Sequence, residues 1–167
     1  MGVLSLQQDD VLFAQDLPPS VNRQLQQAVS LYHDTDRAEQ SLWQAHELAP
    51  DRLEVYIALY KFYFYKGRLE EAETVVYSAL RVAAELGGFV SDWSLLDESS
   101  APWTPAEGVV RFYLYSLKAL AFIRLRLDDA AMAQQILAKL LQLDPEDQVG
   151  ASVIVDLALA VEEGEHG

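Results

Sequence analysis

The segment that decides the fold is YIALYKFYFYKG, Tyr56–Gly67, which carries six aromatic rings. Advancing by about 100° per residue, a helix places one set of these side chains on a single stripe: Tyr56, Leu59, Tyr60 and Tyr63. A second stripe, which faces another direction, holds Ile57, Lys61, Phe64 and Tyr65. The segment is therefore predicted to form a helix that serves two surfaces and ends at Gly67.

The composition limits the kinds of partner. The chain has 167 residues, of which 51% are hydrophobic, so one domain with a sizeable core is expected. It carries 26 acidic and 12 basic residues, which give a formal net charge of −14. Such a charge repels nucleic-acid phosphates and anionic lipid surfaces, so we expect neither nucleic acid nor a membrane as partner.

Cysteine is absent, which excludes disulfides, thiol catalysis and cysteine-based zinc sites. The N-terminal residues MGVLSLQQDD have no basic region ahead of an apolar run, so they do not resemble a signal peptide. The apolar run ASVIVDLALAV is too short to span a bilayer and contains Asp156. A soluble, cytoplasmic protein is predicted.

Helical patterns dominate the rest of the chain, because apolar residues recur at three- and four-residue spacing and no alternating strand pattern is found. After an arm over residues 1–18, with Asp16 as a candidate cap, a helix is predicted to reach about His33. Further helices are predicted over about Thr35–Leu48, Asp51–Tyr65, Leu69–Glu85, Thr104–Leu127, Asp129–Leu143 and Asp147–Glu163.

One long stretch, GGFVSDWSLLDESSAPW over residues 87–103, breaks this periodicity. It is followed by Thr104-Pro105-Ala106-Glu107, which has the pattern of a capping box. Thr104 would cap the helix, Pro105 would be its first residue, and Glu107 would complete the box.

The helix pairs share a pattern of large residues in the first helix and small residues in the second. Ala38, Ala72 and Ala133 fall at one position of this pattern, and Pro50 and Pro145 at another. The pattern resembles the tetratricopeptide repeat, a helix–turn–helix unit of about 34 residues. The matching segments are residues 19–52, 53–86 and 114–147, with an insertion at 87–113 and a capping helix at 147–163.

Some positions depart from the repeat family. Tyr60 stands where a small residue is usual, Arg124 where an apolar one is expected, and Asn22 and Ala84 replace an aromatic residue and a proline. The resemblance nevertheless covers residues 19–163, and it implies an all-α solenoid of three helix–turn–helix repeats.

The resemblance also implies a concave groove on the first helices that holds an extended peptide or an amphipathic helix of a partner. The residues of this chain at the groove positions are Arg23, Gln27, Ile57, Lys61, Phe64, Tyr65, Lys118, Phe122 and Arg126. Several of these are cations in an acidic chain, so the partner segment is predicted to carry acidic and apolar residues. The alternatives are that these cations neutralise nearby carboxylates, and that the second stripe is covered by the arm or the insertion.

The predicted function is therefore a non-catalytic protein-binding adaptor. One alternative is a dedicated chaperone or assembly factor for a single client, because small acidic three-repeat proteins resemble type III secretion chaperones, although the insertion at 87–113 does not fit that class. A less favoured alternative is an enzyme or small-molecule binder that uses the aromatic helix as a pocket wall.

Two further surfaces are candidates for contacts. The insertion carries Phe89, Trp93 and Trp103, which either bind a partner or fold back onto the seam between the second and third repeats. The last helix carries Val153, Ile154, Leu157 and Val161, which either cap the repeats or pair with a second copy in a homodimer.

No pattern of residues indicates catalysis or a cofactor. His33, His46 and His166 lie far apart, without metal-ligand spacing. The pairs Glu70-Glu71 and Asp128-Asp129 suit the starts of helices. Gly87-Gly88 is not a phosphate-binding loop. We therefore expect no catalytic residue, metal or cofactor.

Overall fold

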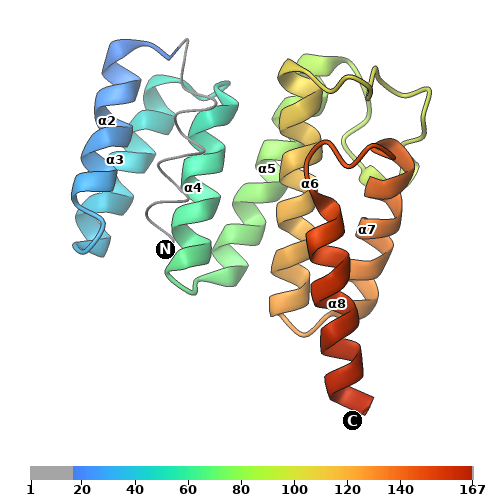
Figure 1. The fold of residues 1–167 in the computed structure, drawn as a ribbon. Coiled ribbons are helices and arrows are strands. Elements are labelled where there is room, and N and C mark those ends of the chain that lie inside the picture. The colour runs from blue at the N-terminus through green and yellow to red at the C-terminus, as the bar shows by residue number, and fades with distance from the viewer. Residues whose placement is uncertain (1–16, 167) are drawn as a thin grey trace. The chain divides into compact units, whose positions relative to one another are not determined.

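The computed structural model describes residues 17–166, with side chains described as far as residue 159, and all regular elements within that part are helical (Figure 1). They are α2 (Pro19–Ser30), α3 (Thr35–Leu48), α4 (Leu53–Tyr65), α5 (Leu69–Gly87), the 3-10 turn η1 (Trp93–Leu95), α6 (Gly108–Arg126), α7 (Ala130–Leu143) and α8 (Ala151–His166). The predicted all-α class is confirmed for these residues. The candidate cap Asp16 lies outside them.

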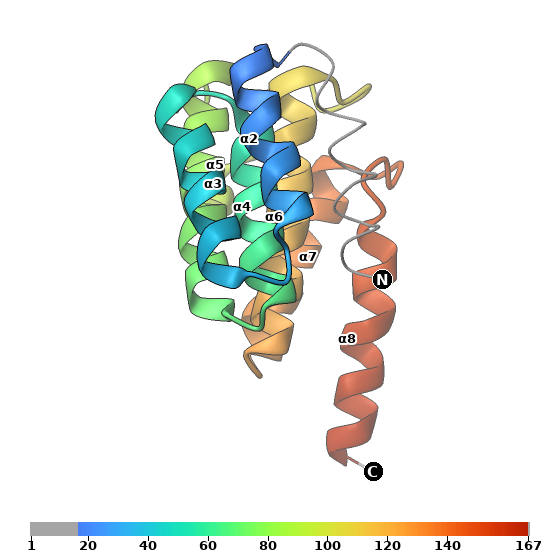
Figure 2. The ribbon, with the colours of Figure 1, turned by 90° about the vertical axis from the view of Figure 1, so that its left-hand side faces the viewer.

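The chain divides into two compact units, Met1–Val75 and Val76–Gly167, and the boundary falls inside α5. In the first unit α2 packs against α3, and α3 packs against α4. Both views show α2 and α3 side by side (Figures 1 and 2). In the second unit α6 packs against α7, α8 contacts both, and η1 contacts α7.

Helix α4 is almost entirely buried. Every residue from Leu53 to Tyr63 is buried, including the aromatic stripe predicted to form a core. An all-round apolar helix has to be covered on several sides, since no face of it is compatible with water. Apolar residues of the neighbouring helices, Val21, Leu25, Ala28, Ala38, Leu42 and Ala45, complete the core.

The turn after α4 has the geometry that its glycine predicts. Gly67 has φ +76°, and the Arg68 amide donates to the Tyr63 carbonyl at 2.9 Å while the Gly67 amide donates to the Phe64 carbonyl. These two bonds satisfy the last carbonyls of the helix. The turn after α6 repeats this arrangement with Asp128 at φ 62° and the Asp129 amide bonded to the Arg124 carbonyl.

The start of α6 corrects one prediction. The helix begins at Gly108, and Thr104 forms no capping box with Glu107. The Ala106 amide donates instead to the Gln148 side-chain oxygen at 2.7 Å, and the Thr104–Pro105 peptide is cis. The segment before α6 is therefore tied to the loop before α8 rather than wound into the helix.

The start of α8 also differs from the prediction. The helix begins at Ala151, whereas the sequence predicts a start at Asp147. Asp147 has φ 57°, and its carboxylate accepts bonds from the Ser152 amide and hydroxyl. The hydrogen bonds from Ser152 hold the pKa of the Asp147 carboxyl below its usual value. Asp147 thus caps the helix from outside it.

The exposed side of α8 is partly apolar. Ile154 and Ala158 are buried, whereas Val153, Leu157 and Leu159 are exposed. The Val161 side chain lies outside the described residues. Among the described helices, none has the length and apolar character needed to cross a bilayer.

Candidate functional site

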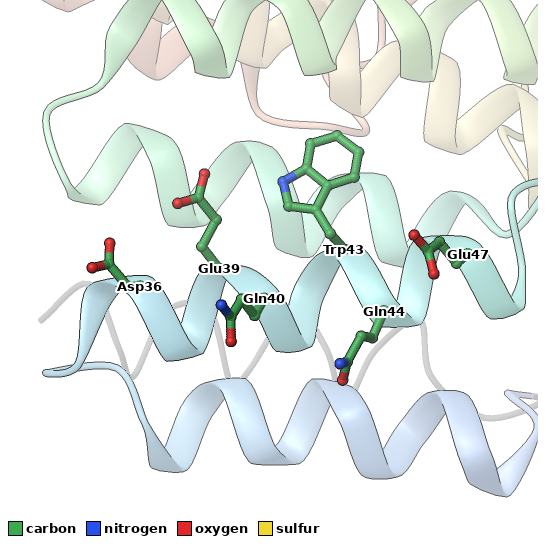
Figure 3. Close-up of a pocket in the computed structure, with 6 residues that line it drawn as sticks. All are labelled: Asp36, Glu39, Gln40, Trp43, Gln44 and Glu47. Carbon is green, nitrogen blue, oxygen red and sulfur yellow. The ribbon is translucent and has the colours of Figure 1, made fainter.

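An open hollow of about 570 Å³ lies along one face of α3, in the first unit. Its lining residues recur at the three- and four-residue spacing that puts side chains on one helix face: Asp36, Glu39, Gln40, Trp43, Gln44 and Glu47. Figure 3 shows Glu39 and Trp43 rising from one side of α3, and Gln40 and Gln44 pointing from the other. The hollow is thus lined by one aromatic ring and five polar side chains, all from a single helix.

Trp43 is exposed yet fixed in place. Its side chain is 39% exposed. Its indole Nε1–H donates to the Tyr63 hydroxyl at 2.8 Å, and its ring meets the His46 ring edge-on with centroids 5.2 Å apart. The ring therefore presents apolar surface to solvent with its orientation already set.

Tyr63, which accepts the hydrogen bond from Trp43, lies on the buried helix α4. Its hydroxyl accepts from Trp43 and donates to the Glu39 carboxylate. Burial, reinforced by the bond to Glu39, raises the pKa of Tyr63 to about 12. The phenol therefore keeps its proton at neutral pH and continues to donate to Glu39.

The charge of Glu39 is balanced inside the unit. The Arg68 guanidinium binds both Glu39 oxygens, at 3.0 and 3.2 Å, and also forms two bonds to Glu71. The hydrogen bonds to these carboxylates raise the pKa of Arg68, and the bonds from Arg68 lower the pKa of Glu71. Arg68 also lies 4.7 Å from the Tyr63 ring centroid. Glu39, which lines the hollow, is therefore held in place by Arg68.

The other polar side chains of the hollow are uncommitted. Within the described part of the chain, Asp36, Gln40, Gln44 and Glu47 take part in no hydrogen bond or ion pair. All four are exposed. The hollow thus combines a rigid ring with carboxylates and carboxamides that are available to a ligand.

Comparison with known proteins gives one informative relative. The chain is 33% identical over 122 residues to a protein of Azotobacter chroococcum mcd 1 that is named "Uncharacterized 19.8 kDa protein in nifW 5'region". The aligned part covers 72% of this chain and 68% of that protein. The two chains belong to one protein family. No known family model matches the chain, and no solved structure matches it.

The predicted groove residues of the first unit differ in their exposure. Arg23 and Gln27 on α2 are exposed, Tyr65 is exposed, and Phe64 is half-buried. Ile57 is 1% exposed and Lys61 is 9% exposed, so neither offers an accessible surface here. Two members of the second stripe, Ile57 and Lys61, are therefore interior, whereas its aromatic members, Phe64 and Tyr65, are half-buried and exposed.

In the second unit the predicted groove residues lie on successive turns of α6: Lys118, Phe122 and Arg126. Lys118 is committed to its own unit, because its Nζ donates to the Val149 carbonyl at 2.7 Å and lies 4.8 Å from the Tyr115 ring centroid. Burial lowers the pKa of Lys118. Lys118 thus binds a backbone carbonyl rather than a carboxylate, and the alternative in which the cations neutralise nearby carboxylates stays a prediction. A groove that uses residues of both units stays a prediction.

The aromatic residues of the insertion lie against the second unit. Trp103 is 4% exposed, donates from Nε1 to the Asp97 carbonyl at 2.9 Å, and packs against Phe89 and Tyr113. Phe89 is half-buried, as is Trp93 within η1. Trp103 is therefore buried inside the second unit, and whether the insertion fills the seam between the second and third repeats or binds a partner stays a prediction.

Sequence reasoning missed Trp43 and the α3 face. The sequence analysis singled out the densest run of aromatic residues, which is buried as far as Tyr63. The available signal was a single aromatic residue whose neighbours one turn away on the same helix, Glu39, Gln40 and Glu47, are all polar. In the described part of the chain no three acidic or histidine side chains gather closely enough to hold a metal ion.

Proposed function

We propose that this chain is a non-catalytic protein-binding adaptor that receives a segment of a partner protein on the α3 hollow. The observation that carries the proposal is the exposed Trp43 ring, whose position is fixed by Tyr63 and His46. Tryptophan is enriched among the residues that supply most of the binding energy at protein interfaces. A ring that is already oriented loses little conformational entropy when a partner binds.

The repeated helix pairs support an adaptor built on tetratricopeptide-like repeats. Gly67 and Asp128 occupy the same position in the second and third predicted repeats, and both adopt a left-handed conformation closed by the same pair of backbone bonds. Equivalent turns are what a repeated helix–turn–helix unit requires. A rigid helical scaffold of this kind is suited to presenting a preformed surface.

The α3 face is a better-supported surface than the groove predicted from the sequence. Lys61 and Ile57 are buried, and Lys118 holds the loop before α8. By contrast, four of the polar residues that line the hollow, Asp36, Gln40, Gln44 and Glu47, have no side-chain partner among the described residues. A docking surface needs a well-oriented aromatic ring and nearby polar side chains that can form hydrogen bonds with a partner.

The related Azotobacter protein suggests where a search for the partner can begin. Its name places its gene in the 5′ region of nifW. The product of that neighbouring gene is therefore the first candidate partner that we propose to test. Proteins identified by unbiased affinity capture would be tested next.

The test is affinity capture with the tagged chain, followed by mass spectrometry, using the wild type, Trp43→Ala and Tyr77→Ala. Tyr77 is a matched control because it is an aromatic residue on α5 with a similar exposure of 40%. We expect Tyr77→Ala to retain a partner, and Trp43→Ala to lower its recovery by about tenfold or more.

Equal recovery of the same partner by Trp43→Ala would remove the α3 face from the proposal. Recovery of no protein, together with thermal stabilisation by a small metabolite, would favour the small-molecule reading instead.

A further inference from the structure

We propose that the α3 hollow recognises an arginine-bearing segment of the partner, with the guanidinium stacked on the Trp43 ring and paired with Glu47. This inference rests on the proposed function and adds the chemistry of the partner. The exposed face of α3 is thereby assigned one occupant, a basic stretch of another polypeptide.

The first support is the placement of Trp43 relative to Glu47. The two residues are separated by one helical turn on the same face, so their side chains are neighbours. A guanidinium over an indole ring gains a cation–π attraction, and tryptophan is the best of the aromatic side chains for this contact. The planar group can then direct its remaining N–H donors to the adjacent carboxylate.

The second support is the charge that remains after the internal contacts are counted. Glu39 is neutralised by Arg68, whereas Asp36 and Glu47 have no cation among the described residues. Two cations of the first unit are engaged in other contacts: Arg68 holds Glu39 and Glu71, and Lys66 donates to the Tyr32 carbonyl. The hollow is thus a negative surface on a chain whose formal net charge is −14. Complementarity of charge requires a positive partner.

The third support is the pair of carboxamides. Gln40 and Gln44 line the same hollow, point away from Glu39 and Trp43 in the view of Figure 3, are exposed, and have no side-chain bonds among the described residues. A carboxamide offers both donors and an acceptor, as a peptide backbone does. Asp36 and Glu47 lie about 16 Å apart along α3, which gives a basic segment two anchoring charges with the amides between them.

Arginine is expected to be preferred to lysine. Its guanidinium is planar, stacks on aromatic faces and is more weakly hydrated, whereas a lysine ammonium is a strongly hydrated point charge. Because the carboxylates are exposed, the affinity should fall as ionic strength rises.

The test uses NMR of the full chain, in which the indole N–H signal of Trp43 is assigned by its loss in Trp43→Phe. The probes are short capped peptides of alternating alanine with arginine, lysine or glutamate. We expect the arginine peptide to shift the Trp43 signal saturably while the Trp103 signal stays in place, because Trp103 is buried and bonded to Asp97. The lysine peptide should bind more weakly and the glutamate peptide should not bind.

Variants then separate local recognition from general attraction to an acidic chain. We expect Trp43→Ala to weaken binding of the arginine peptide about fivefold, and Glu47→Gln to weaken it about twofold to threefold. Glu98→Gln is the matched control, since it removes one exposed carboxylate from the insertion, in the other unit. It should leave the affinity unchanged.

Equal effects of Glu47→Gln and Glu98→Gln would overturn the inference, as would equal binding of the lysine and arginine peptides or an unmoved Trp43 signal. Failure of the proposed function looks different. If the captured partner depends on Trp43 but not on Glu47 or Asp36, the adaptor remains and only the arginine chemistry is lost. If capture of the partner does not depend on Trp43 either, both the proposed docking on the α3 hollow and the arginine recognition are wrong.

Discussion

Replacing Trp103 with alanine is expected to destabilise the unit formed by residues 76–167 by about 3–5 kcal/mol. The side chain is 4% exposed, and its ring lies 5.4 Å from that of Phe89 and 6.1 Å from that of Tyr113. Removing it leaves a cavity between the insertion and α6, and the Asp97 carbonyl loses its bond from the indole. Thermal unfolding followed by circular dichroism should show a midpoint lowered by roughly 10 °C.

The control for this prediction is Trp93→Ala in the same insertion. Trp93 is only half-buried, so its truncation should cost about 1 kcal/mol or less. Equal losses for the two variants would mean that Trp103 is not the residue that fastens the insertion to the unit.

Replacing Asp144 with alanine is the second large effect, expected to cost roughly 3–4 kcal/mol of unfolding free energy. Asp144 is 1% exposed, and its carboxylate accepts from the Gln148 amide, the Gln148 side chain and the buried Val149 amide at 2.9–3.1 Å. Alanine leaves these donors without an acceptor. Gln148 in turn donates to the Trp103 carbonyl and accepts from the Ala106 amide, so the loss should spread to the insertion.

Urea unfolding measures this loss, with Asp156→Ala on the exposed side of α8 as the matched control. The control should change the free energy of unfolding by less than about 0.5 kcal/mol. Amide exchange adds a positional readout, because residues 103–106 should lose protection in Asp144→Ala. A loss confined to α8 would contradict the link through Gln148.

The sequence correctly predicted those helix ends that are set by hydrogen bonds between residues close in sequence. The helix from Thr35 to Leu48 begins where Asp34 accepts a bond from the Arg37 amide, and α4 ends at Gly67, whose positive φ suits a residue without Cβ. The all-helical class followed from apolar spacing, which reflects burial directly.

The two helix starts that were predicted wrongly depend on particular side-chain contacts, one distant in sequence and one local. Thr104, Pro105 and Glu107 have the residue types of a capping box, but the Ala106 amide is taken by Gln148 from the loop before α8. Nothing near Thr104 reveals that acceptor. Asp147 was likewise predicted to begin the last helix, and it sits before it because its carboxylate holds Ser152.

The candidate site shows a similar division. The sequence indicated that aromatic residues around Tyr60 would be important, and they are, as the buried core of the first unit. Whether an aromatic side chain is buried or exposed depends on how many neighbouring helices pack against its own helix. The composition of the sequence does not give that number. Trp43 remained unnoticed because its one distinguishing property, an exposed ring bonded to Tyr63, is a tertiary one.

The most direct test of the account is photo-crosslinking from single positions in the complex with the captured partner. Benzoylphenylalanine is placed at Gln44, an exposed side chain of the α3 hollow without internal bonds, or at Arg126, an exposed position of the groove predicted from the sequence. We expect a crosslink from position 44 and none from position 126, because the proposed docking surface lies on α3. A crosslink from position 126 alone would contradict it and place the partner on α6.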